Sequence, residues 1–71
     1  MKIEKSTRLV EEGNFVARVS VTLLHDGSGW SPYLSHEDML KLDDVREALR
    51  RGDIDAAAKE AKVYELLPIS A

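Results

Sequence analysis

The clearest pattern of hydrophobic and polar positions lies between Phe15 and His25. Apolar side chains occupy the odd-numbered positions, whereas the centre of the even-numbered side holds Arg18, Ser20 and Thr22. Alternation of this kind, with many β-branched residues, is typical of a strand with one buried face. The pattern predicts a strand over residues 14–25 whose even-numbered face stays in water.

A second extended segment precedes this strand. Apolar and β-branched residues are interspersed with charges over residues 2–11, and Gly13-Asn14 readily adopts positive φ. We therefore predict a β-hairpin formed by residues 2–11 and 14–25. Charges discourage pairing between molecules, so three cations favour an edge position for the first strand: Lys2, Lys5 and Arg8.

The segment after the hairpin changes from turn to helix. Asp26–Gly29 contains two glycines and predicts a turn, and Pro32 limits residues 30–34 to a short edge strand at best. Ser35 then begins a helix, with Asp38 three residues later as in a weak capping box. Gly52 ends that helix as a C′ glycine.

This first helix carries an apolar stripe at helical spacing, which consists of Met39, Leu42, Val45 and Leu49. We expect the stripe to face the sheet, with Met39 and Leu34 forming a hydrophobic staple at the start of the helix. On its outer face, two i,i+4 ion pairs are expected: Glu37 with Lys41, and Glu47 with Arg51.

The last third of the chain admits two interpretations. Asp53 caps a second helix whose apolar face consists of Ile54, Ala57, Ala58 and Ala61. Continuing this period would place Glu65 within the apolar face, so we predict that the helix stops near Lys62 and that residues 63–69 form a last strand. The alternative is a helix that continues through Leu67, which would make the fold a β-hairpin followed by a helical hairpin.

These elements predict one small α+β domain over residues 1–71. The fold class is a small antiparallel sheet, in the order β-β-(β)-α-α-β, with two helices packed on one face. A chain this short buries only about 60% of the surface that its unfolded form exposes. With no cysteine for disulfides, it is expected to gain stability from a homodimer or another protein partner.

Composition narrows the function classes. The net charge of −3 gives no general attraction to nucleic acid, and neither a membrane span nor an export signal is recognisable, so we expect a cytoplasmic protein. His25 and His36 lie at turns without a catalytic triad context, and His36 has Leu40 rather than a histidine four residues later. The expectation is therefore no enzyme, no cofactor and no metal site.

Two sets of residues remain as candidates for binding. Tryptophan and tyrosine combine a large area with a polar group, so three aromatic residues are candidates either for the core or for a protein interface: Trp30, Tyr33 and Tyr64. A nucleic-acid-binding regulator that uses the first helix is the alternative, with contacts from Arg46, Arg50 and Arg51. Acidic residues interrupt that cationic group, which favours a solvated helix face instead.

The stretch GWSPYLS at residues 29–35, followed by KLDDVREALRRGD at residues 41–53, resembles a group of small uncharacterised bacterial proteins from toxin–antitoxin gene neighbourhoods. This resemblance carries no catalytic motif. Together with the small size and the negative charge, it leads us to expect a protein-interaction module, in its concrete form an antitoxin-like subunit that binds a basic protein partner.

Overall fold

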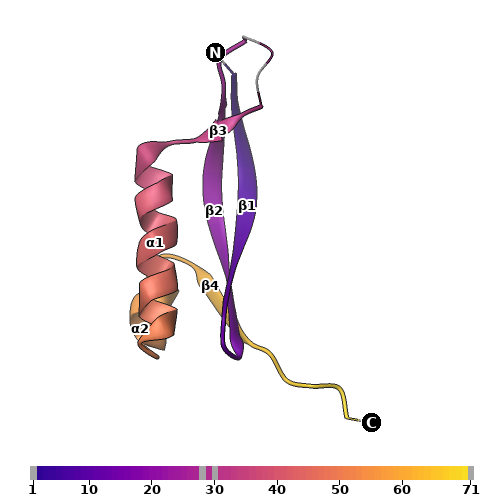
Figure 1. Ribbon diagram of the computed structural model, residues 1–71, viewed down its shortest axis with the longest axis vertical. Helices are drawn as coiled ribbons and strands as arrows, with labels where there is room; N and C mark the ends of the chain where they lie inside the picture. The colour runs from indigo at the N-terminus through magenta and orange to yellow at the C-terminus, as the bar shows by residue number, and fades with distance from the viewer. Residues whose placement is uncertain (1, 28, 30, 71) are drawn as a thin grey trace.

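The computed structural model describes residues 2–27, 29 and 31–70. Figure 1 shows a long hairpin flanked by one long helix, with a short helix and a short strand near the hairpin turn. In chain order the elements are β1 (Lys2–Glu12), β2 (Phe15–His25), β3 (Tyr33–Leu34), α1 (His36–Arg50), α2 (Ile54–Ala58) and β4 (Lys62–Glu65). The chain thus has the predicted α+β class and the predicted order of elements.

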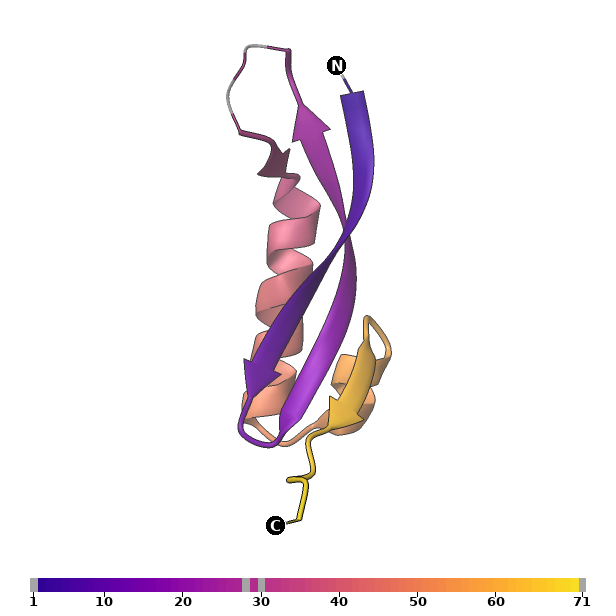
Figure 2. The same cartoon turned by 90° about the vertical axis from the view of Figure 1, so that its right-hand side faces the viewer.

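The hairpin of β1 and β2 is confirmed. Antiparallel pairing runs without interruption from Lys2 opposite His25 to Glu12 opposite Phe15. Gly13 has a φ of +57° in the connecting turn, a conformation that other residues rarely adopt. Figure 2 shows that β1 crosses in front of β2, so the hairpin is strongly twisted along its length.

The core lies between the hairpin and the second half of α1. Odd-numbered residues of β2 face the helices, as the alternation predicts, while Arg18 and Ser20 on the other face are exposed. The eight buried hydrophobic residues of the described chain come from β1, β2, α1 and α2: Val10, Ala17, Val19, Val21, Val45, Ala48, Leu49 and Ala57. None is larger than leucine, so the core is thin.

The prediction that the apolar stripe of α1 faces the sheet is wrong for Met39. Val45 and Leu49 are buried and Leu42 packs against them, but the Met39 residue is 47% exposed. Met39 lies about 120° around the helix from Val45, and Ala48 takes a core position instead. The buried residues of α1 all lie in its second half (Val45, Ala48 and Leu49), whereas Met39 lies in the first half, away from this core.

The predicted start and end of α1 are confirmed, but the predicted ion pairs on its outer face are not. The Asp38 N–H donates to Ser35 Oγ (3.2 Å), and Gly52 has a φ of +76°. The expected i,i+4 pairs are replaced by i,i+3 pairs of Lys41 with Asp38 (3.8 Å) and Arg50 with Glu47 (2.9 Å). Arg51 instead contacts Asp53 at 3.8 Å. Lys41 and Arg50 each also reach the hairpin, and those tertiary contacts decide their orientation.

The C-terminal segment is a strand, and the alternative helix through Leu67 is wrong. α2 ends at Ala58, earlier than predicted, and β4 pairs antiparallel with Phe15–Arg18 of β2. Val63 packs against the core from this strand, which a continued helix would not allow. The ladder is shorter than the predicted residues 63–69, and beyond Glu65 the Leu66 N–H donates to Asn14 O (2.6 Å).

The molecule is elongated for its size. Its Cα radius of gyration is 14.3 Å, against about 11 Å for a compact domain of this length. Its accessible surface is 5425 Å², whereas a compact monomer of 7.9 kDa exposes about 4,400 Å². The chain therefore carries about 1,000 Å² more surface than a compact monomer of its mass.

A pair of substitutions in α1 tests the position of the core. Val45→Ala removes two fully buried methyl groups and is expected to lower the free energy of unfolding by about 2 kcal/mol. Leu40→Ala in the same helix removes a half-exposed side chain and should change it by less than about 0.5 kcal/mol. Urea unfolding followed by circular dichroism measures both values, and equal losses would contradict this core.

Candidate functional site

The second edge of β2 is divided among three elements. β3 pairs with Leu23–Leu24 at one end, and β4 pairs with Phe15–Arg18 at the other. Between them, two side chains of α1 bind the backbone directly. The Thr22 N–H donates to Asp38 Oδ2 (2.6 Å), and Lys41 Nζ donates to Ser20 O (2.6 Å).

We call Asp38 and Lys41 the edge clamp. Their side chains are 16% and 30% exposed, and Lys41 Nζ lies 3.8 Å from Asp38 Oδ1, so the two charges also support each other. Hydrogen bonds with an ionised partner are shorter and stronger than neutral ones. The clamp therefore occupies backbone groups that an added strand would need, and β2 is closed to further pairing.

A polar groove lies beside the edge clamp. Its volume is about 460 Å³, and its lining includes hydroxyl and charged side chains from both hairpin strands and α1: Lys5, Ser6, Thr7, Ser20, Val21, Thr22, Asp38 and Lys41. No cluster of three or more His, Asp or Glu side chains that could hold a metal occurs among residues 2–27, 29 and 31–70. His25 Nε2 lies 3.1 Å from Glu4 Oε1 across the hairpin, and His36 is exposed.

The outer edge of β1 is open. Within the part of the chain that the structure describes, β1 pairs only with β2. Ser20 and Thr22 direct their backbone groups away from β1, so alternation assigns the odd-numbered residues of β1 to its outer edge. Ile3 and Leu9 lie on that edge, and each is 66% exposed.

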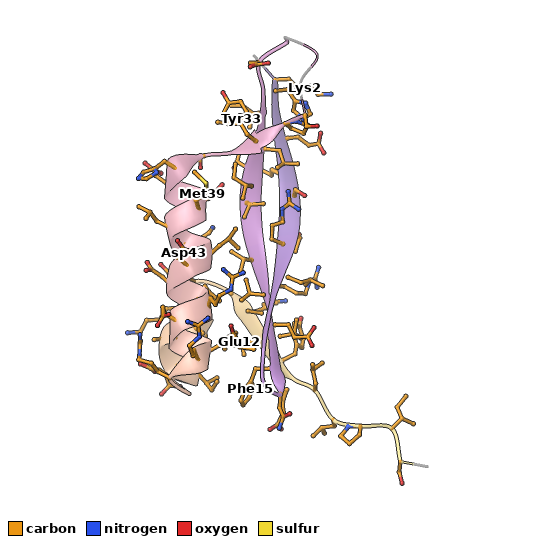
Figure 3. All side chains as sticks on the ribbon, in the orientation of Figure 1. Lys2, Glu12, Phe15, Tyr33, Met39 and Asp43 are labelled. Atoms are coloured by element: carbon orange, nitrogen blue, oxygen red, sulfur yellow. The ribbon has the colours of Figure 1, made fainter. Side chains whose placement is uncertain are left out.

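The predicted aromatic residues do not form one cluster. Tyr33 is opposite Leu24 and Tyr64 is opposite Val16, eight positions apart on β2, which corresponds to about 26 Å. Figure 3 shows Tyr33 and Phe15, the neighbour of Val16, near opposite ends of the hairpin. Tyr33 and Tyr64 are 47% and 43% exposed, so they serve no common core. The prediction for Trp30 lies outside the described residues.

The three arginines proposed for nucleic-acid contact all lie beside carboxylates. Arg46 is 3.7 Å from Asp43, and Arg51 is 3.8 Å from Asp53. Arg50 binds Glu47 (2.9 Å) and also Glu12 (3.2 Å), whose side chain lies between β1 and the last turns of α1 in Figure 3. These acids partly neutralise the cationic group that a phosphate backbone would need.

Charge is distributed unevenly between the two layers. Residues 36–60, which contain both helices, hold eight acidic and five basic residues, whereas β1, β2 and β4 with the hairpin turn hold four acidic and five basic ones. The exposed residues of α1 include four carboxylates and two apolar side chains, with Arg46 and Arg50 interspersed among them, and we call the acidic and apolar ones the acidic helix face. Its members are Glu37, Met39, Leu40, Asp43, Asp44 and Glu47.

The sequence interpretation missed this face because it assigned Met39 to the core. Met39 is 47% exposed and Leu40 is 51% exposed. The helical period does place Leu40 opposite Val45, and this was the signal that could have identified it as an outward residue. Met39 and Leu40 are two of several large hydrophobic side chains that the described chain leaves exposed.

Comparison with protein-family models, with curated proteins and with solved structures finds no match to this chain. In the described part of the chain, no helix has both the length and the apolar character that crossing a lipid bilayer requires. The surfaces themselves therefore supply the evidence on function.

The edge clamp predicts a local change in amide exchange. Asp38→Ala removes the acceptor of the Thr22 N–H, so that amide is expected to exchange about tenfold faster with solvent. The neighbouring Val21 faces Ser6 of β1 and should keep its rate. Hydrogen exchange followed by NMR measures both amides, with Asp44→Ala as the matched control on α1. An unchanged Thr22 rate would show that the clamp does not hold the edge.

Proposed function

We propose that this chain is a protein-interaction module, an antitoxin-like subunit that binds a basic protein partner through the acidic helix face. The observation that carries the proposal is the exposure of Met39 and Leu40 among four carboxylates. The resemblance of residues 29–35 and 41–53 to small proteins of toxin–antitoxin neighbourhoods supports the same class of function.

The chemistry of this face favours a protein over a small ligand. It is the convex outer side of a 15-residue helix, and such a surface binds best in a groove of a partner. Burial of Met39 and Leu40 supplies affinity, because apolar side chains at the centre of an interface contribute most of the binding energy. The surrounding carboxylates attract a positively charged partner and select its orientation.

The ion pairs within the face leave acidic charge available. Asp43 and Glu47 contact Arg46 and Arg50, whereas Glu37 and Asp44 have no ion pair among the described residues. Both of the latter residues are exposed. A cationic side chain of a partner therefore has two carboxylates to bind without displacing an existing contact.

Binding to a basic protein tests this function, and the products of neighbouring genes are the first candidates to use as the partner. Leu40→Ser combined with Asp44→Lys removes apolar area and reverses a charge, so the dissociation constant is expected to rise at least about tenfold. Isothermal titration calorimetry measures it, and higher salt should weaken binding of the unaltered chain.

The matched control is Leu67→Ser combined with Glu65→Lys, which makes the same kinds of change at the exposed end of β4 and in the segment that follows it. The control is expected to bind within about twofold of the unaltered chain. Equal weakening by both variants, or no binding by the folded unaltered chain, would overturn the proposal. A salt-sensitive gel shift that Arg50→Ala abolishes would favour the nucleic-acid alternative instead.

A further inference from the structure

The outer edge of β1 offers a binding surface that is separate from the acidic helix face. We infer that two copies of this chain pair antiparallel along their β1 strands, about a twofold axis at Ser6, and so form one continuous sheet. This inference does not rest on the proposed function, because it uses the outer edge of β1 and no residue of α1; in the upper part of Figure 1, β1 and α1 lie on opposite sides of β2.

Among the described strands, β1 offers the longest open edge for strand addition, because β3 and β4 have only two and four residues. β3, the edge clamp and β4 occupy the second edge of β2, whereas β1 has an unpaired edge along its 11 residues. Unpaired backbone groups along a long, regular strand readily accept another strand.

Charge limits the registers in which β1 can pair with itself. Only odd-numbered residues present backbone groups to the outer edge, so the twofold axis must pass through a residue of β1 that faces its own copy. An axis at Glu4, Lys5 or Arg8 would place like charges directly opposite each other, which is destabilising. Axes near the strand ends pair few residues, and Ser6 and Thr7 remain.

The two remaining registers bring different residues of the two β1 strands opposite each other. With the axis at Thr7, Ile3 would face the partner's Glu11 and Leu9 would face the partner's Lys5. With the axis at Ser6, Ile3 faces the partner's Leu9, and apolar contacts replace both of these mismatches. Cross-strand pairs of matching character stabilise a sheet, so the register centred on Ser6 is favoured.

The register centred on Ser6 also places opposite charges across from each other. Glu4 faces the partner's Arg8, and symmetry repeats this opposite-charge pair on the other side of the axis. Arg8 makes no ion pair within the described residues, so its guanidinium is available. Four hydrogen-bonded residue pairs would exchange about eight backbone bonds across the axis. The opposite-charge pairs and the apolar pairs of Ile3 with Leu9 together favour this register.

Cysteine cross-linking reads the register directly, because the natural chain contains no cysteine. In the favoured register Ser6 faces its own copy as a non-hydrogen-bonded pair, with Cα atoms about 4.5 Å apart, within the range for a disulfide. Mild oxidation of Ser6→Cys is expected to convert most of the protein to a reducible dimer. Lys5→Cys and Thr7→Cys, treated identically, should remain mostly monomeric on a non-reducing gel.

Each other result of the cross-linking contradicts the inference. Preferential cross-linking of Thr7→Cys would assign the axis to Thr7, and equal cross-linking of all three variants would indicate random collision. Absence of cross-linking in every variant would show that β1 does not pair with itself. Circular dichroism confirms in each case that the variant is folded.

A charge exchange tests the same pairing without cysteine. Glu4→Arg alone and Arg8→Glu alone each create like-charge pairs across the axis, so the dimer dissociation constant from light scattering should rise at least about tenfold. The double variant Glu4→Arg with Arg8→Glu restores opposite charges and should return to within about threefold of the unaltered chain. It has also lost the contact of Glu4 with His25, so its recovery separates the interchain pair from that contact.

Glu37→Arg on α1 is the matched control and should leave the dissociation constant unchanged. A monomeric unaltered chain at every concentration, or a double variant no better than the single ones, would overturn the inference. Neither result would affect binding of a basic partner at the acidic helix face, so failure here is distinguishable from failure of the proposed function.

Discussion

Ser20 and Thr22 present backbone groups to the second edge of β2 at a point that neither β3 nor β4 reaches. A backbone polar group that loses water needs another partner, and α1 supplies one through the edge clamp of Asp38 and Lys41. This requirement sets the position of the whole helix. Its first half lies along the edge of β2, and only its second half covers the sheet with Val45, Ala48 and Leu49.

The thin core and the elongated shape follow from that position. Half of a helix can cover only half of a long hairpin, so the part of β1 from Lys2 to Leu9 contributes no fully buried side chain. Small domains have little hydrophobic stabilisation to begin with, and this one exposes more surface than its mass requires. A sheet that continues into a second molecule gives the exposed half of the hairpin the neighbour that α1 does not provide.

Local patterns in the sequence were sufficient to predict the strands and helices, but not to predict how these elements contact one another. The alternation in β2 and the helix signals at Ser35 and Gly52 depend on neighbouring residues, and the structure confirms each of them. The prediction that Met39 is buried is wrong, because the burial of this residue depends on the position of α1 relative to β2. The choice between strand and helix near Tyr64 likewise depends on pairing with β2, which no local pattern contains.

The candidate sites likewise combine features that the sequence predicts with features that depend on tertiary contacts. Tyr33 and Tyr64 could be named from the sequence as candidate interface residues, but their separation along β2 is a property of the sheet register. The edge clamp combines two α1 residues with backbone atoms 16 and 21 positions earlier, so spacing in the sequence gives no sign of it. The arginines of α1 could be recognised as balanced by acids, although Arg50 also reaches Glu12 of the hairpin.

The two proposed surfaces are compatible and would reinforce each other. In the upper part of Figure 1, α1 and β1 flank β2 on opposite sides, so pairing through that part of β1 would leave both acidic helix faces exposed in the dimer. Two such faces on one particle can bind a multivalent basic partner with an avidity that exceeds the affinity of either face. Self-association would then serve binding as well as stability, because the strand that lacks a neighbour in one chain joins two binding helices in the pair.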